Sequence, residues 1–261
     1  MSRAIESELL EQRIAENAAA QEIDLATWIF ERINVRPGDR VLELCCGTGG
    51  QTLSLLERVG NDGKVVALDV SKSALNTLAG KAAGYGDRLT LVEGNLENVP
   101  GSLHDALSAQ IDFDWMFCAY GLYYSSDAPR TLREARSLLK RDGRIVVAGP
   151  FGPNNKPLFD LVRESGVNIA EPVVFSSELF MLQMVLPWAA RNFESVAVST
   201  MVNPVRWNSA ERVMNYWQNT TFYDAGRKDD FKRRVDEHFA KHRVFVNEKW
   251  VMLVEMSHGR D

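Results

Sequence analysis

Five short apolar runs, separated by helical stretches, follow one another between residues 40 and 149 and constrain the fold of this chain most strongly. The runs are RVLEL (40–44), KVVALDV (64–70), RLTLVEG (88–94), DWMFCAY (114–120) and RIVVAG (144–149). They are almost continuously apolar rather than alternating, which is typical of parallel strands covered by helices on both faces. The pattern therefore predicts an α/β protein with a mostly parallel sheet and crossover helices.

The segments on either side of these runs have different patterns. Residues 1–36 are predicted to form an N-terminal helical cap, and 37–150 to form the core. Residues 151–261 are predicted to form a helical insertion and two last strands that complete the same domain. One of these strands is FESVAVSTMV (193–202); the other, VFVNEKWVMLVEM (244–256), alternates as an edge or antiparallel strand would.

A helix is predicted over 131–140, before the last strand of the core. Apolar residues, among them Leu138 and Leu139, fall on one side of it. Gly143 follows at a position where glycine commonly supplies the left-handed residue that ends a helix.

Composition and charge exclude several classes of protein. The 261 residues are 45% hydrophobic and 25% charged, as in an ordinary folded domain, and the net charge of −5 lacks the basic excess of a nucleic-acid-binding protein. No apolar run approaches the ~20 residues of a membrane span, so we expect a cytoplasmic protein without membrane contact. Neither the three cysteines nor His238 and His242 fit a metal motif, and no metal is predicted.

The sequence from Val41 to Val59 runs from a strand through a glycine turn into an amphipathic helix. Gly47 and Gly49 have no Cβ, so a ligand can approach the backbone closely, and the free amides at the start of the helix favour electron-rich groups. Asp69 lies twenty residues beyond Gly49, at the end of the second strand, where a carboxylate can accept hydrogen bonds from the hydroxyls of a ribose. Together these features predict a nucleotide-type site.

Two classes of nucleotide fit this pattern, a nicotinamide dinucleotide and a cofactor that carries an ammonium group. A nicotinamide dinucleotide site requires a third glycine at residue 52, which is Thr52. Glu43, at the end of the first strand, would lie beside the ligand, where a carboxylate suits an ammonium group better than a pyrophosphate.

The stretch ELCCGTG (43–49) resembles the first motif of class I S-adenosylmethionine-dependent methyltransferases, an acid followed by G-x-G-x-G. Cys45 replaces the first glycine, as in the form seen among ubiquinone and menaquinone biosynthesis methyltransferases. The resemblance extends over about 40–150 and includes LDV (68–70), GNLENVP (94–100), FDWMFCAYGLYYSSD (113–127) and LREARSLLKRDGRIVV (132–147).

This resemblance implies a Rossmann-like sheet of seven strands, the last antiparallel, with a helical cap and with S-adenosylmethionine as cofactor. It implies that Glu43 and the Cys45–Gly49 turn, which includes Gly47, hold the methionine end, and that Asp69 holds the ribose. It further implies adenine contacts from Val70, Asn95 and Leu96, and a sulfonium contact from Ala119. The amide oxygen of Asn95 would accept from the exocyclic amine of adenine.

Transfer of the methyl group to oxygen, nitrogen or carbon of a small-molecule acceptor is the activity that the resemblance implies. Tyr120 and Tyr124 follow the fourth strand, where the family places residues that face the acceptor, and a phenol there can orient a nucleophile. A non-catalytic S-adenosylmethionine-binding partner or scaffold is the alternative, and a nicotinamide oxidoreductase is a third interpretation. The clustered cysteines also leave arsenical methylation open.

Aromatic residues are concentrated between the last two predicted strands. They include Trp207, Tyr216 and Trp217. Their spacing predicts the core of a helical region, and a cap over the acceptor is the alternative.

Overall fold

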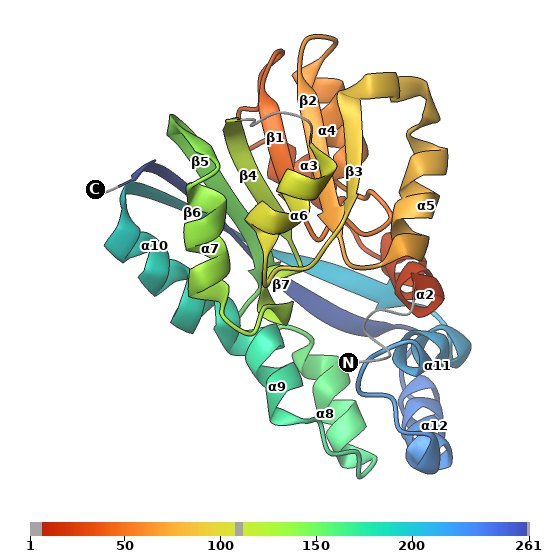
Figure 1. The fold of residues 1–261 in the computed structure, drawn as a ribbon. Helices are drawn as coiled ribbons and strands as arrows, with labels where there is room; N and C mark the ends of the chain where they lie inside the picture. Colours follow the sequence, from red (N-terminus) through yellow and green to blue (C-terminus); the bar gives the residue numbers. More distant parts are fainter. Residues whose placement is uncertain (1–6, 108–111, 260–261) are drawn as a thin grey trace. The chain divides into compact units, whose positions relative to one another are not determined.

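A seven-stranded sheet in the order β3-β2-β1-β4-β5-β7-β6 organises the structure, a computed structural model that describes residues 7–107 and 112–259 (Figure 1). Each strand from β1 to β5 pairs in parallel with its neighbours in this group. The predicted α/β, Rossmann-like sheet is confirmed. The strands are β1 (Arg40–Leu44), β2 (Lys64–Asp69), β3 (Leu89–Glu93), β4 (Phe113–Ala119), β5 (Leu139–Pro150), β6 (Phe193–Trp207) and β7 (Phe245–Gly259).

The chain divides into two compact units, each built from separate stretches of sequence. The sheet unit comprises Leu25–Gly149, Met181–Ser199 and Met252–Asp261, and the helical unit comprises Met1–Asp24, Pro150–Phe180 and Thr200–Val251. The predicted division into an N-terminal helical cap (1–36), a core (37–150) and a segment that completes the same domain (151–261) stays a prediction.

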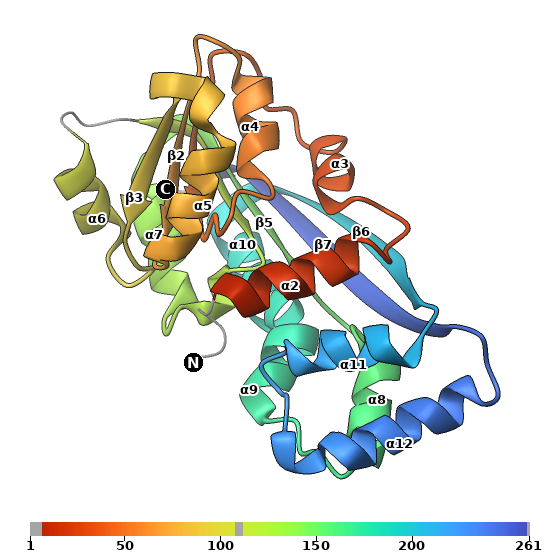
Figure 2. The same cartoon turned by 90° about the vertical axis from the view of Figure 1, so that its right-hand side faces the viewer.

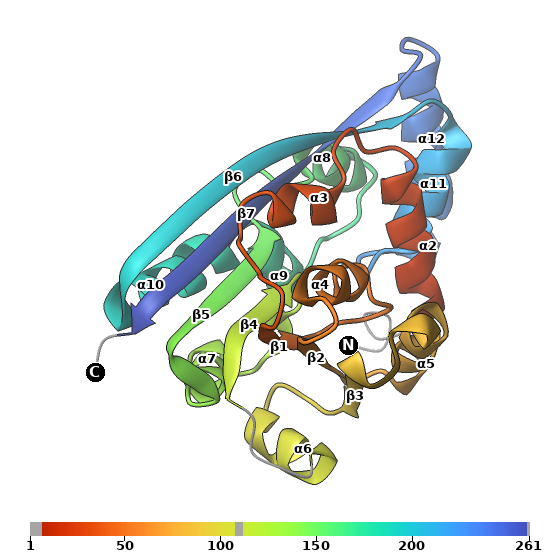
Figure 3. The same ribbon diagram turned by 90° about the horizontal axis from the view of Figure 1, so that it is seen from above.

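Helices cover both faces of the parallel strands in the sheet unit (Figure 3). The chain moves from β1 to β3 in one direction and from β4 to β5 in the other, so right-handed crossovers place α4 and α5 on one face and α6 and α7 on the opposite face. The helices of this unit are α3 (Leu25–Phe30), α4 (Thr52–Val59), α5 (Lys72–Lys81), α6 (Val99–Ala106), α7 (Ala128–Arg136) and α10 (Leu186–Asn192).

The helical unit has an aromatic core of its own. Trp207, Trp217 and Phe231 are completely buried, and Tyr216 packs against Trp207 with ring centroids 4.8 Å apart. The predicted aromatic core is therefore confirmed. Figure 2 shows α11 and α12 side by side in this unit. Its helices are α2 (Ser7–Ala18), α8 (Lys156–Glu164), α9 (Glu171–Val174), α11 (Ala210–Gln218) and α12 (Lys228–Phe239).

The two last strands run in opposite directions. β6 passes from the sheet unit into the helical unit and β7 returns, so β7 is antiparallel, as predicted (Figure 3). β7 lies between β5 and β6, however, and β6 forms the edge of the sheet. β6 also extends beyond the predicted 193–202 and contains Pro204, which an edge strand tolerates. Among the described residues, the outer side of β6 carries only an isolated bridge, between Gln21 and Val205.

The predicted helix over 131–140 is wrong at its C-terminal end. α7 ends at Arg136, and Leu139 is already the first residue of β5, where it pairs with Phe113 of β4. A Cβ on Gly143 would lie 2.7 Å from the Cβ of Leu139 and 2.9 Å from the carbonyl oxygen of Lys140. Glycine is thus required there by close packing at an irregularity of the sheet, and the helix does not end at Gly143.

No single helix within 7–107 and 112–259 has the length and apolar composition of a membrane span. Two helical segments, 171–179 and 181–192, meet these criteria only when they are counted together across a bend.

Candidate functional site

The residues predicted to bind a nucleotide lie at the carboxyl ends of four neighbouring parallel strands. The strands are adjacent in the order β3-β2-β1-β4, and the carboxyl ends of parallel strands meet at the same edge of a sheet. The structure places Glu43 and Cys45 at the end of β1, Asp69 and Val70 at the end of β2, Asn95 and Leu96 after β3, and Ala119 and Tyr120 at the end of β4.

Glu43 is an acidic side chain near the carboxyl end of β1, which is a central strand of the sheet. It pairs with Ala67 of β2 and with Phe117 of β4, and only 2% of its surface is exposed. Among the residues that the structure describes, its Oε2 atom has no hydrogen-bond partner. A buried carboxylate oxygen without a partner costs free energy, which a cationic ligand group at this point would recover.

Burial dominates the electrostatics of Glu43. Its pKa is raised from 4.5 to about 8, mainly by the loss of water on burial and to a smaller extent by the negative charge of Asp69. The hydroxyl of Thr52, on the first turn of α4, opposes this increase, although it does not lie in hydrogen-bond geometry. Near neutral pH the free protein therefore holds a proton on Glu43 that an ammonium ligand would displace.

The turn that follows β1 brings the backbone into left-handed conformations three times. Cys45, Gly47 and Gly49 have φ angles of 58°, 54° and 88°. A Cβ at Gly49 would overlap the Cδ1 atom of Leu78 on α5, so this glycine is needed for packing. A Cβ at Gly47 would meet no atom of the described residues within 4 Å. That space can admit a ligand to the backbone of the turn.

Asp69 holds this turn to the end of β2. Its Oδ2 atom accepts a hydrogen bond from the amide of Gly47 (2.8 Å), and its Oδ1 atom accepts one from the amide of Ser71 (2.8 Å). Because each carboxylate oxygen can accept a second hydrogen bond, Asp69 can still take two ribose hydroxyls. The next residue, Val70, is 54% exposed, as an apolar contact for a planar ring would be in the free protein.

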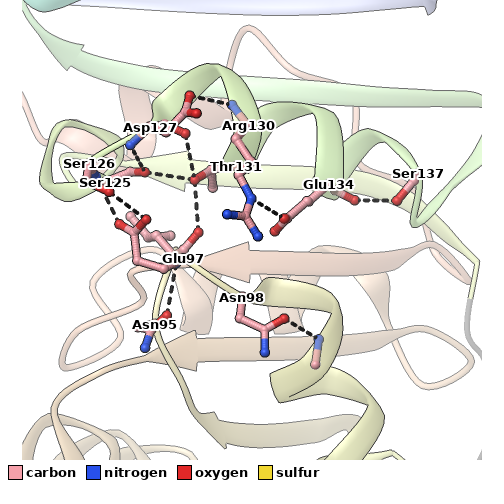
Figure 4. A network of polar contacts seen from close by, with 12 residues as sticks. Asn95, Glu97, Asn98, Ser125, Ser126, Asp127, Arg130, Thr131, Glu134 and Ser137 are labelled. Atoms are coloured by element: carbon pink, nitrogen blue, oxygen red, sulfur yellow. Dashed lines mark hydrogen bonds and ion pairs between the residues drawn. The ribbon is translucent and has the colours of Figure 1, made fainter.

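The loop after β3 is held in place by its own side chains and by the loop after β4 (Figure 4). The Oδ1 atom of Asn95 accepts from the amide of Glu97 (2.9 Å), which leaves its second lone pair for another donor. Leu96 is buried, and its carbonyl accepts from the hydroxyl of Thr131 on α7 (2.9 Å). Asn95 and Leu96, two of the three predicted adenine contacts, thus lie on a loop whose conformation is supported by hydrogen bonds.

The two tyrosines predicted to act on the acceptor have different surroundings. Tyr120 is half-buried directly after β4, has a φ of 57°, and donates its amide to Ala148 of β5 (2.8 Å). Tyr124 ends the short 3-10 turn Leu122–Tyr124 and is 51% exposed, with its ring against Tyr123. Tyr120 is therefore better placed than Tyr124 to contact a ligand in a dry site.

Cys45, Cys46 and Cys118 lie at the carboxyl ends of β1 and β4. The thiol of Cys118, together with burial, raises the pKa of Cys45, and burial raises the pKa of Cys46 well above its usual range. Gly121 accommodates this cluster, since a Cβ there would overlap Cys45. Within 7–107 and 112–259, no group of three or more metal-ligating side chains could hold a metal ion. Cys46 and Cys118 are buried and Cys45 is half-buried, as is common for cysteines that pack as small apolar residues.

The site as a whole suits an adenosyl group that carries an ammonium. The unpartnered oxygen of Glu43 fits the ammonium, the open backbone at Gly47 admits the chain that bears it, and Asp69 fits a ribose. With a seven-stranded sheet whose last strand is antiparallel, this arrangement is typical of class I methyltransferases, and the cofactor it implies is S-adenosylmethionine.

Comparison with known proteins agrees with this assignment. Residues 41–143 match the family described as a methyltransferase domain. The demethylmenaquinone methyltransferase of Lactobacillus johnsonii is 31% identical over 138 residues, which are 52% of this chain and 53% of the relative. The 2-phytyl-1,4-naphtoquinone methyltransferase of Trichormus variabilis is 35% identical over 123 residues, which are 46% of this chain and 51% of the relative.

The chain spans about half the length of these curated relatives. The crystal structure of the YcgJ protein from Bacillus subtilis has the same fold, with a TM-score of 0.60 and 16% identity over 90% of this chain and 98% of that one. Residues 41–143 are therefore similar to a methyltransferase domain, and the chain has the fold of the YcgJ protein.

Several residues of the site carry no signal in the sequence. Thr52, Glu97, Gly121, Ser126 and Thr131 act through neighbours that are distant along the chain. Thr52 lies within the glycine-turn motif, and Glu97, Gly121 and Ser126 lie within stretches that resemble the family, but the sequence does not reveal the partners of these residues.

Proposed function

We propose that this protein transfers the methyl group of S-adenosylmethionine to a small-molecule acceptor. The observation that carries the proposal is the side chain of Glu43, a buried carboxylate with one unpartnered oxygen at the edge of the sheet where Gly47 and Asp69 meet. A carboxylate in such a position would stabilise the protein only when a cation binds to it.

Each part of the cofactor would contact a different strand end. Glu43 would accept hydrogen bonds from the ammonium, and the second lone pairs of the Asp69 carboxylate would accept from the two ribose hydroxyls. Val70 would lie against one face of the adenine, and the loop with Asn95 and Leu96 along its edge. Ala119 would lie next to the sulfonium.

When bound, S-adenosylmethionine supplies a methyl group that a nucleophile can displace in line. The protein would hold the acceptor atom in line with the methyl group and exclude water, which requires no strong general base. The half-buried phenol of Tyr120 is proposed to orient the acceptor and to contact the cationic methyl group with its ring. Tyr124 would have a smaller role because half of its surface is in water.

The acceptor is proposed to be a quinone-type aromatic compound in its reduced form. This part of the proposal is supported by the names of the two relatives, a demethylmenaquinone and a phytylnaphthoquinone methyltransferase. A cytoplasmic location is proposed with it.

The direct test is a transfer assay on the full chain. S-Adenosylmethionine and chemically reduced naphthoquinones would be incubated with the protein, and S-adenosylhomocysteine and a product heavier by one methylene would be measured by mass spectrometry. We expect both in equal amounts, and much less of both with Glu43→Gln. Cofactor binding without transfer to any of a broad acceptor panel would support the non-catalytic scaffold instead.

A matched pair of variants tests the role proposed for Tyr120. We expect Tyr120→Phe to lower kcat by about 100-fold, a typical contribution of a positioned proton-bearing group, without changing the affinity for S-adenosylhomocysteine. Tyr124→Phe is the control and should leave kcat nearly unchanged. Equal effects of the two substitutions would contradict the role given to Tyr120.

A further inference from the structure

Two loops at the cofactor edge of the sheet unit are tied together by hydrogen bonds. One is the adenine loop, residues 94–98 after β3, and the other is the acceptor loop, residues 120–127 after β4. The carboxylate of Glu97 spans them, since its Oε1 atom accepts from the amide of Ser126 (2.9 Å) and its Oε2 atom accepts from the hydroxyl of Ser126 (2.7 Å), as Figure 4 shows. Both oxygens of one side chain are thus committed to one residue of the other loop.

The same side chain is connected to the predicted adenine contact. The amide of Glu97 donates to the Oδ1 atom of Asn95, so a continuous series of bonds runs from Asn95 through Glu97 to Ser126. Ser126 follows Tyr123 and Tyr124 in the acceptor loop by only two or three residues. The bonds therefore connect a predicted adenine contact with the acceptor loop.

The adenine loop has two connections to the chain after β4, and they differ in exposure. Glu97 binds Ser126 of the acceptor loop, and Leu96 binds Thr131 of α7, whose hydroxyl also lies 2.9 Å from that of Ser125. The bond from Thr131 to the carbonyl of Leu96 is buried, whereas the Glu97 carboxylate is exposed to water. Hydrogen bonds from Ser126 hold the pKa of Glu97 below its ordinary value, so the side chain is a carboxylate at neutral pH. An exposed bond of this kind contributes little on its own, and it can open and close while the buried bond keeps the loops in register.

From this arrangement we infer that Glu97 is a positioning residue that couples occupancy of the adenosine site to the ordering of the acceptor loop. The inference rests on the proposed function, because it takes the adenine loop to bind the cofactor. Cofactor that docks against Asn95 and Leu96 would reduce the motion of the adenine loop, and the Glu97 bonds would pass this ordering to residues 120–127. By linkage, an ordered acceptor loop would strengthen cofactor binding by the same factor.

Hydrogen exchange measured by mass spectrometry on the full chain tests this coupling without an acceptor. The readout is the exchange of the amides of residues 120–124, compared with and without saturating S-adenosylhomocysteine. These amides are not bonded to Glu97, so a lost bond alone does not change them. We expect the ligand to slow their exchange in the wild type, and Glu97→Ala to reduce that slowing by about two- to fivefold, as expected for an exposed charge-assisted bond.

Three further variants separate coupling from a merely structural effect. Glu97→Gln keeps an acceptor for the Ser126 amide and should restore most of the protection. Ser126→Ala removes only the hydroxyl and should give a smaller loss in the same direction. Glu134→Ala is the matched control, because it removes a carboxylate that pairs with Arg130 (2.8 Å) inside α7, and it should leave the coupling intact.

The possible results distinguish the inference from the function on which it rests. If Glu97→Ala binds S-adenosylhomocysteine and keeps the full protection of 120–124, the coupling role is overturned and the proposed function stands. If Glu134→Ala loses as much protection as Glu97→Ala, the coupling role is also overturned. If the wild type binds no S-adenosylhomocysteine, both proposals fail together.

Discussion

Replacing Glu43 by glutamine should make the free protein more stable while it weakens cofactor binding. The carboxyl group is fully buried, and burial raises its pKa to about 8. In the unfolded chain the same group has its ordinary value of 4.5, so between these two values the folded protein binds a proton that the unfolded chain has lost. The stability that this group provides below pH 4.5 is therefore lost as the pH rises through about 8.

The magnitude follows from the difference between the two pKa values. At about 1.4 kcal/mol per pKa unit, full ionisation of Glu43 costs the folded state about 5 kcal/mol, and at pH 7 the loss is about 3 kcal/mol. Glutamine has nearly the same shape and no charge to bury. We expect Glu43→Gln to raise the free energy of unfolding by about 2–3 kcal/mol at pH 7 and to have little effect at pH 4.5.

Urea unfolding of the full chain, repeated at half-unit steps from pH 4.5 to 8.5, measures this effect. Glu57→Gln, which changes an exposed glutamate on α4, is the control and should follow the wild type. Saturating S-adenosylhomocysteine at 100 times its Kd should add about 2.7 kcal/mol to the wild type, and much less to Glu43→Gln at the same concentration. A variant that is less stable than the wild type at pH 8, or a difference that does not grow with pH, would refute the reasoning.

Three further substitutions or treatments test the geometry of the site. Gly47→Ala should cost about 1–2 kcal/mol of backbone strain and weaken S-adenosylhomocysteine binding strongly, whereas Gly49→Ala should act mainly on Tm; equal losses of binding would argue against ligand contact at Gly47. Gly121→Ala should destabilise the protein by about 1–3 kcal/mol, and the double variant with Cys45→Gly should recover most of this; no recovery in urea unfolding would contradict the predicted overlap. The thiol of Cys46, whose pKa burial raises, should react with Ellman's reagent far more slowly in the native than in the denatured chain; rapid native reaction at pH 7.5 would count against it.

The sequence was sufficient to predict the parallel strands and the residues that meet at their carboxyl ends. Apolar runs such as RVLEL and KVVALDV recur between helical stretches, which indicates parallel strands, and parallel strands bring their ends together whatever the loops do. For this reason Asp69 could be predicted to lie beside Gly47 from spacing alone, and the 2.8 Å hydrogen bond between them agrees.

The errors arose where local pattern leaves two structures open. Leu138 and Leu139 continue the helical spacing of α7, but Leu139 belongs to β5 because Phe113 provides a partner strand there. Short apolar segments cannot be assigned to helix or strand by period alone, and Gly143 fits either assignment. The position of β7 inside the sheet likewise depends on a pairing with β6 that alternation does not reveal.

The bonds that shape the site were inaccessible for a different reason. Glu97 and Ser126 are 29 residues apart, and their contact depends on how two loops lie after folding. The same is true of Gly121. A Cβ at this position would overlap the side chain of Cys45, whereas the backbone conformation of Gly121 itself does not require glycine. Such contacts join residues of ordinary type, so composition and spacing give no indication of them.

The central claim, that Glu43 binds the ammonium of an adenosyl ligand, is tested most directly by isothermal titration calorimetry of the full chain with S-adenosylhomocysteine. The titration would be done at pH 7 in two buffers of different ionisation enthalpy and repeated at pH 6 and 8. We predict binding with release of nearly one proton at pH 7, and an affinity that rises by up to about tenfold per pH unit toward pH 8. Absence of binding, or an affinity that does not change between pH 6 and 8, would contradict the claim.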